Sequence, residues 1–203
     1  MEAQALSSVA TALHVMGEQR QRSLDLYRQA VALWHQILRT AAPGPNTRDT
    51  QGVLADQLST FGAVLTSHGP EGMAEAEACL REALALSDSL SDLWLAQKIL
   101  SYLINLCGEA GTSVRPAEAE AFRSQLNQCL VQMGRSPETS CSICLESLSP
   151  PAGGAAEDAA GSGGSGPSDS CVRALACDHQ FHHGCLTSWG RKTASRACPL
   201  CKR

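Results

Sequence analysis

The C-terminal part of the chain carries eight cysteine and histidine residues in four closely spaced pairs, and this spacing constrains the fold more than any other feature. One or two residues between the members of a pair let a tight turn direct both side chains at the same metal ion. A structural zinc ion takes four nitrogen or sulfur ligands in a tetrahedron, so eight candidates predict two zinc ions. In chain order the candidates are Cys141, Cys144, Cys177, His179, His182, Cys185, Cys198 and Cys201.

The spacing and the residues around these ligands resemble the RING finger family, and within it the RING-H2 class, whose fourth and fifth ligands are histidines. The resemblance covers residues 141–203 and includes Ile143 in CSICLE, Phe181 before the fifth ligand, CLTSW at 185–189 and Pro199 in CPLC. It implies two interleaved sites that brace distant segments against each other. One zinc ion would then be held by Cys141, Cys144, His182 and Cys185, and the other by Cys177, His179, Cys198 and Cys201.

RING fingers of this class act as ubiquitin-protein ligases, so the resemblance implies that activity. Such a ligase has no catalytic cysteine; it binds a ubiquitin-conjugating enzyme charged with ubiquitin and promotes transfer to a substrate lysine. The residues at the family's docking positions are Ile143, Trp189, Pro199 and Leu200, although Trp189 also fits ordinary core packing. Lys202 stands where the strongest family pattern has arginine, whose planar guanidinium bridges both partners. We therefore expect weaker activity.

Other functions for the same cluster have less support. A cysteine nucleophile needs a free thiol, and Cys171, the nearby thiol outside the ligand set, has no partner visible in the sequence. A nucleic-acid partner is not expected, because the net charge is −4 and no aromatic residues alternate with the basic ones. A non-catalytic zinc-binding scaffold that mediates protein–protein interaction stays open as the alternative to a ligase.

His183 lies between two candidate ligands and needs an account of its own. If a helix begins near residue 182, His182 and Cys185 lie about 60° apart around its axis, whereas His183 and Cys185 lie about 200° apart. We therefore expect His183 to point away from the metal and to be exposed.

Residues 149–170 interrupt the ligand pattern with a low-complexity stretch of glycine, alanine, serine and proline. The stretch has nothing large to bury, so we expect a disordered insert within the zinc domain. Because loop-closure entropy grows slowly with length, the two sites tolerate such an insert. The rest of this region has few large apolar residues, so zinc must supply most of its stability.

Residues 1–135 predict a helical domain, which a zinc finger domain over 136–203 follows. Between breaks rich in proline and glycine, apolar residues recur at helical spacing. The fold class is therefore mainly α. The expected helices cover 3–17, 21–40, 50–67, 71–89, 91–109 and 116–133.

The helical region also contains an internal repeat. The segment AEACLREALAL (76–86) aligns with FRSQLNQCLVQ (122–132), and SLDLYRQAVAL (23–33) follows the same pattern. The positions of Ala76, Leu80, Ala83 and Leu84 resemble the tetratricopeptide family. This resemblance implies stacked helical hairpins whose groove binds a protein partner. A plain six-helix bundle is the alternative. The cysteines of these helices are expected to be small buried hydrophobes: Cys79, Cys107 and Cys129.

The first residues, MEAQALSSVATALHVMG, have no basic flank and no long apolar run, so we expect no signal peptide. No stretch approaches the roughly 18 apolar residues of a membrane-spanning helix, so no membrane partner is expected. These features predict an intracellular, soluble protein of the cytoplasm or nucleus. In a reducing compartment, the ten cysteines predict metal ligands and buried thiols rather than disulfides.

Overall fold

The computed structural model describes residues 2–202 apart from 18, 43, 108, 110, 136, 138, 149–170, 176, 178 and 194–196. The predicted disordered insert lies outside the described residues. The described part forms seven helices and two short strands, which confirms the mainly α fold class. None of these helices is both long enough and apolar enough to cross a membrane. The elements are α1 (Glu2–Val15), α2 (Arg20–Thr40), α3 (Pro45–Thr66), α4 (Pro70–Leu90), α5 (Leu93–Asn105), α6 (Pro116–Gln132), β1 (Val172–Ala174), β2 (Gln180–His182) and α7 (His183–Thr193).

Six helices occupy the regions that the periodicity predicts, with differences at two ends. α3 begins at Pro45 rather than near residue 50, so the predicted start of the helix expected over 50–67 is wrong. A proline in the first turn of a helix loses no backbone hydrogen bond, and α4 and α6 begin at prolines in the same way. α5 ends at Asn105 rather than near 109, because the chain turns at Leu106 and Cys107.

The chain divides into two compact units, Met1–Ile99 and Leu100–Arg203. The division falls within α5, and it groups α6 with the zinc-binding segment. A domain boundary between residues 135 and 136 stays a prediction. Below, the two units are described separately and are called the first and the second unit.

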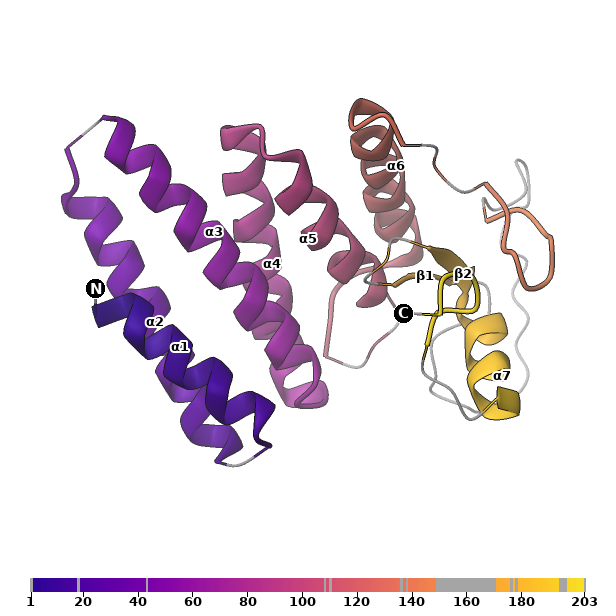
Figure 1. Ribbon diagram of the computed structural model, residues 1–203, viewed down its shortest axis with the longest axis horizontal. Helices are drawn as coiled ribbons and strands as arrows, with labels where there is room; N and C mark the ends of the chain where they lie inside the picture. The colour runs from indigo at the N-terminus through magenta and orange to yellow at the C-terminus, as the bar shows by residue number, and fades with distance from the viewer. Residues whose placement is uncertain are drawn as a thin grey trace. The chain divides into compact units, whose positions relative to one another are not determined.

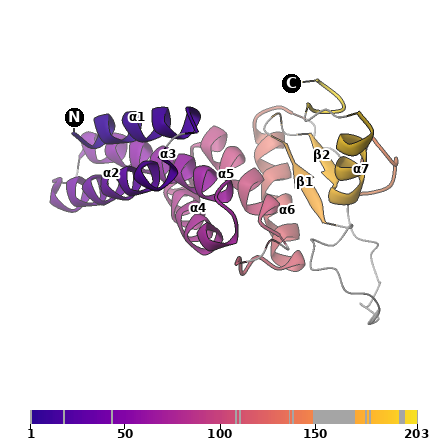
Figure 2. The ribbon, with the colours of Figure 1, turned by 90° about the horizontal axis from the view of Figure 1, so that it is seen from below.

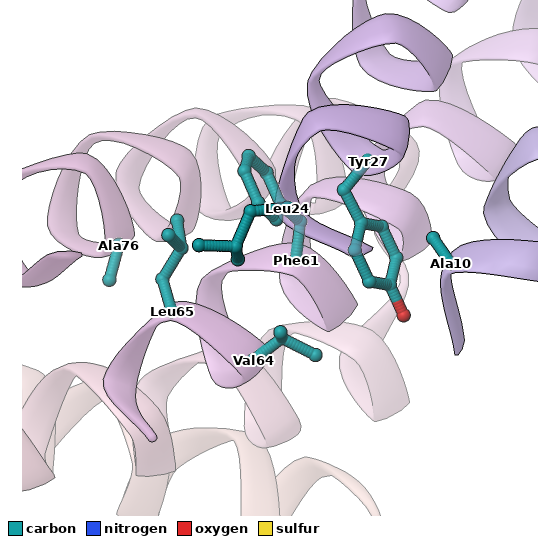
Figure 3. Close-up of a cluster of buried hydrophobic side chains, with 7 residues drawn as sticks. All are labelled: Ala10, Leu24, Tyr27, Phe61, Val64, Leu65 and Ala76. Atoms are coloured by element: carbon teal, nitrogen blue, oxygen red, sulfur yellow. The ribbon is translucent and has the colours of Figure 1, made fainter. Parts of the chain in front are cut away.

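In the first unit, helices that follow one another in the sequence pack side by side: α1 on α2, α2 on α3, and α3 on α4 (Figure 1). The rings of Tyr27 and Phe61 stack at the centre, with centroids 5.4 Å apart (Figure 3). The Tyr27 hydroxyl lies 2.8 Å from Thr11 Oγ1, so its polar end is satisfied inside the core. One apolar cluster thus joins all four helices through Ala10, Leu24, Tyr27, Phe61, Val64, Leu65 and Ala76.

Helices α3 and α4 approach closely where the repeat pattern lies. Ala76, Leu80 and Ala83 are fully buried. Gly62 of α3 faces Leu80, and a Cβ atom at Gly62 would lie 2.8 Å from Leu80 Cγ. The absent side chain therefore permits the close approach. Burial of these positions agrees with paired hairpins, and the tetratricopeptide assignment itself stays a prediction.

In the second unit, β1 and β2 form an antiparallel pair with Arg173 opposite Phe181. α7 packs on both strands, and the pair lies between α6 and α7 (Figure 2). A small core surrounds Phe181, and its buried members are Cys141, Leu148, Phe181 and Cys198. Two of these four residues are candidate metal ligands, so the core and the metal region are the same place.

Candidate metal centres

Two groups of four cysteine and histidine side chains come together in the second unit. The potential ligand atoms of each group all lie within 4.8 Å of one another. Ligands of a tetrahedral zinc ion with Zn–S bonds of 2.3 Å are about 3.8 Å apart, so each group has the right size and chemistry for one zinc ion. The groups are those that the RING pattern implies: Cys141, Cys144, His182 and Cys185 in site 1, and Cys177, His179, Cys198 and Cys201 in site 2.

The two sites alternate along the chain, so each fastens segments that are far apart in the sequence. Site 1 joins the turn at 141–144 to the junction of β2 and α7, because His182 ends the strand and Cys185 lies in the first turn of the helix. Site 2 joins the stretch before β2 to the turn at 198–201. β2 and the first turn of α7 therefore position two of the eight ligands, and the connection between the two strands carries two more, Cys177 and His179.

The two Cys-x-x-Cys turns, residues 141–144 and 198–201, share one backbone geometry. The N–H of Leu145 donates to the carbonyl of Cys141 at 2.7 Å, and that of Lys202 donates to the carbonyl of Cys198 at 2.9 Å. Leu145 and Lys202 both have positive φ, 64° and 57°. This left-handed residue after the second cysteine ends each turn and fixes where the following side chain begins.

Electrostatics at site 1 favour a thiolate at one position in particular. Burial alone would raise the pKa of Cys141, but backbone N–H groups of Cys144, His182 and Ile143 donate to its sulfur and lower that pKa overall. Burial, together with neighbouring thiols, raises the pKa of Cys185 to about 12. A bound zinc ion would supply the positive charge that stabilises both as thiolates, and its binding would therefore release protons.

Hydrogen bonds determine which nitrogen of His182 faces site 1. His182 Nδ1 lies 3.3 Å from Cys144 Sγ, whereas Nε2 lies 3.1 Å from the carbonyl oxygen of Ser147. A ring nitrogen that donates to a carbonyl leaves the other nitrogen free to bind a metal. His182 is therefore oriented to bind through Nδ1. In site 2, His179 Nδ1 lies 3.2 Å from Cys177 Sγ, so it too faces the sulfurs of its group.

His183 belongs to neither group, in agreement with the helical geometry. The expectation that it is exposed is wrong. Arg173 Nε donates to His183 Nδ1 at 3.0 Å, and the same guanidinium pairs with Glu109. Arg173 is 9% exposed and needs acceptors, which explains why His183 lies half-buried against β1.

The residues at the family's docking positions lie on three segments. Ile143 is half-buried in the first turn, and Pro199 is half-buried in the second, where Leu200 is 47% exposed. Trp189 is half-buried on α7, and Lys202 is exposed. Leu145, at 80% exposed, is an apolar surface residue that the sequence analysis missed. Its position directly after a candidate ligand could have indicated this, because the residue that ends such a turn often has a left-handed backbone.

Helical residues of the second unit hold the zinc-binding segment through directed polar contacts, which the sequence analysis also missed. Asn105 Nδ2 donates to the carbonyl of Ala174 at 2.7 Å, and the N–H of Ala174 donates to Asn105 Oδ1 at 3.0 Å. The side-chain amide thus pairs with β1 as a neighbouring strand would. Arg123 of α6, 4% exposed, donates to the carbonyl of Leu148. The small core is therefore supported from the helical side.

Comparisons with known proteins agree with this geometry. Residues 141–201 match the family model described as zinc finger, C3HC4 type (RING finger). That description counts one histidine, whereas this chain has two; zinc accepts either donor. The chain is 30% identical over 98 residues to the E3 ubiquitin-protein ligase SDIR1 of Arabidopsis thaliana, a match that covers 48% of this chain and 28% of that relative. No solved structure matches the chain. Residues 141–201 are therefore a RING-type zinc finger able to bind two zinc ions.

Proposed function

We propose that this chain is a RING-type E3 ubiquitin-protein ligase. It would bind a conjugating enzyme charged with ubiquitin and promote transfer to a substrate lysine, without a covalent intermediate of its own. The observation that carries the proposal is the pair of interleaved four-ligand groups within a segment that matches the RING finger family. The Arabidopsis relative, an E3 ubiquitin-protein ligase by name, supports it.

The metal groups favour binding over metal catalysis. Each has four sulfur or nitrogen donors, which fill the tetrahedron of a structural zinc ion and leave no position for an activated water. The ions would instead hold the two Cys-x-x-Cys turns in place. We propose that these turns and α7 present one shallow apolar surface to the conjugating enzyme, formed by Ile143, Trp189, Pro199 and Leu200.

We further propose that the stacked helices of the first unit recruit a partner protein. α1 to α4 form consecutive packed pairs, as a repeat array requires. Trp94, at the start of α5, is 69% exposed, and exposed tryptophans are frequent anchors of protein interfaces.

Ubiquitination in a purified system with several conjugating enzymes tests the ligase. We expect ubiquitin chains with the wild type, and loss of chains with Ile143→Ala and with Trp189→Ala while both zinc ions stay bound. Val131→Ala is the control, because Val131 is an exposed apolar residue of α6 that is not among the residues of the proposed surface. A zinc-loaded wild type that is inactive with every conjugating enzyme would favour the scaffold alternative.

Lys202 allows a finer test of the same proposal. Its backbone is fixed by the hydrogen bond to Cys198, so an arginine there would begin in the same place. The guanidinium donates in two directions, whereas the ammonium is a hydrated point charge. We expect Lys202→Arg to speed ubiquitin discharge onto free lysine several-fold, since one added hydrogen bond is worth about 1 kcal/mol. Equal single-turnover rates for wild type, Lys202→Arg and Lys202→Ala would remove Lys202 from the mechanism.

A further inference from the structure

Two thiols outside both metal groups meet in the second unit. Cys107 Sγ and Cys171 Sγ lie 3.5 Å apart, although the residues are 64 positions apart in the chain. Both are buried, at 2% and 8% exposed. The sequence assigns Cys107 to a helical face and leaves Cys171 without a partner, so the pair becomes visible only in the fold.

The surroundings of the pair permit a covalent bond between the sulfurs. A disulfide is about 2.05 Å long, so the sulfurs must approach each other by about 1.5 Å. Cys107 lies in the turn after α5, and Cys171 directly precedes β1, so neither residue lies within a helix or strand. The carbonyl of Cys171 accepts from the N–H of His183 at 2.7 Å, which fastens this backbone to the start of α7. The approach therefore requires side-chain rotation and a small adjustment of two turns.

We propose that Cys107 and Cys171 are a redox site, which a small hydroperoxide converts into a disulfide while both zinc ions stay bound. The disulfide would fasten the turn after α5 to the start of β1, next to the polar pairing of Asn105 with Ala174. The thiol pair, and not the zinc ligands, would then be the part of the second unit that responds first to peroxide.

A pocket gives a small oxidant access to both residues. Its volume is about 680 Å³, and both Cys107 and Cys171 line it. Residues of α5, α6 and the zinc-binding segment line it, with Ile104, Glu120 and Val172 among them. Hydrogen peroxide is far smaller than this space, so burial of the thiols does not prevent the reaction.

The two sulfurs have different roles in the reaction. Burial, followed by the contact with Cys171, raises the pKa of Cys107 to about 12, so Cys107 stays a protonated thiol. Cys171 is the more exposed of the two, at 8% against 2%, so we assign to it the attack on the peroxide. Its sulfur bonds to one oxygen, the O–O bond breaks, and the hydroxide leaves as water with the thiol proton. Cys107 then attacks the sulfenic sulfur of Cys171, and the S–O bond breaks to release a second water. Two electrons pass from the thiols to the peroxide.

The zinc-loaded full-length chain tests this assignment. After treatment with one equivalent of hydrogen peroxide and alkylation of the remaining thiols, digestion without reductant should yield one cross-linked peptide, Cys107 to Cys171. A dithiol should remove the cross-link, and both zinc ions should remain bound. The oxidised protein should also unfold at a higher temperature than the reduced protein. This readout needs no conjugating enzyme, so it is independent of the proposed ligase activity.

Single substitutions separate the two roles. Cys107→Ser should stop at a sulfenic acid on Cys171 that a cyclic 1,3-dione traps, whereas Cys171→Ser should give neither trap nor cross-link. Cys129, a half-buried thiol of α6 outside the metal groups, is the internal control and should be alkylated in every sample. The proposal is wrong if peroxide releases zinc before the cross-link forms, or if the cross-link joins another pair of cysteines. It is also wrong if Cys107 and Cys171 of the wild type are both still alkylated after peroxide treatment.

Discussion

The two units of this chain bury their interiors in different ways. In the first unit, four helices share one apolar cluster with stacked aromatic rings at its centre. In the second, the core beside the metal groups has four buried members, and two of them, Cys141 and Cys198, are themselves candidate ligands. The comparison teaches that the first unit is held by area removed from water, whereas the zinc-binding segment of the second unit would be held mainly by ligand bonds to metal.

Their buried polar groups differ in the same sense. Those of the first unit are mostly serines, such as Ser23, which donates to the carbonyl of Ala10 at 2.8 Å. The second unit buries the guanidinium groups of Arg123 and Arg173 and gives them carbonyl, carboxylate and imidazole partners. A buried charge tolerates the loss of its partner poorly, so we expect the second unit to depend more on single contacts.

Removal of metal should produce the largest difference in stability between the two units. Chelation of zinc, or Cys177→Ser, should unfold the zinc-binding segment, because each structural site contributes on the order of 10 kcal/mol. The helices α1 to α4 contain no member of either metal group and should keep their circular dichroism. Zinc content measured together with far-ultraviolet circular dichroism checks this. Complete loss of helical signal on chelation would show that the first unit depends on the second.

Neighbouring histidines provide a matched pair for the same experiment. His182→Ala should lose the zinc ion of site 1. His183→Ala should retain both ions and destabilise the second unit by about 1–3 kcal/mol, because the buried Arg173 loses an acceptor. Equal zinc loss in the two variants would mean that the ligands of site 1 are assigned incorrectly.

Loss of the side-chain amide that pairs with β1 should have the next largest effect. Asn105→Ala leaves the N–H and the carbonyl of Ala174 without their partner, and Ala174 is 2% exposed. We expect a loss of about 2 kcal/mol or more in the free energy of unfolding of the second unit. Asn127→Ala is the control, since Asn127 accepts a single bond of 3.3 Å from Gln180. Similar denaturation midpoints for both variants would contradict a special role for Asn105.

Much of this arrangement could be predicted from local patterns. Helical periodicity predicts six helices, because it depends on residues close in sequence. The spacing of eight residues predicts two zinc ions, and the resemblance to the RING family implies which four ligands form each group. The predicted start of α3 is wrong because a proline such as Pro45 is common both in a loop and in the first turn of a helix. Which of the two structures forms depends on the residues that the helix packs against.

The long-range polar contacts could not be predicted. Asn105 and Ala174 are 69 positions apart, and nothing in the sequence marks an asparagine that pairs with a strand. His183 was expected to be exposed from helix geometry alone, which ignores the acceptor that Arg173 needs from the facing strand. In the sequence, Cys107 looks like an ordinary buried residue of a helix, and only the fold brings it next to Cys171. Periodicity predicts which face is buried but does not identify the facing residue.

Two glycines of α3 test how closely the first unit is packed, and we expect their substitutions to have the smallest effects on stability. A Cβ atom at Gly62 would lie 2.8 Å from Leu80 Cγ and 3.3 Å from the carbonyl oxygen of Ala76, whereas one at Gly52 would meet only Leu90 Cδ1, at 3.8 Å. Gly52→Ala should stabilise the first unit by up to about 1 kcal/mol, because alanine favours the helix. Gly62→Ala gains the same propensity, but overpacking costs about 1–3 kcal/mol.

The difference between these two variants isolates packing, since both exchange the same atoms within one helix. Chemical denaturation of the zinc-loaded chain, followed by helical circular dichroism, should place Gly62→Ala below Gly52→Ala by about 2 kcal/mol. Leu80 is fully buried and cannot move into solvent, so relieving its clash with a Cβ atom at residue 62 costs free energy. If Gly62→Ala is as stable as Gly52→Ala, α3 and α4 can separate freely, and the first unit is not held by close packing in the way that its apolar cluster indicates.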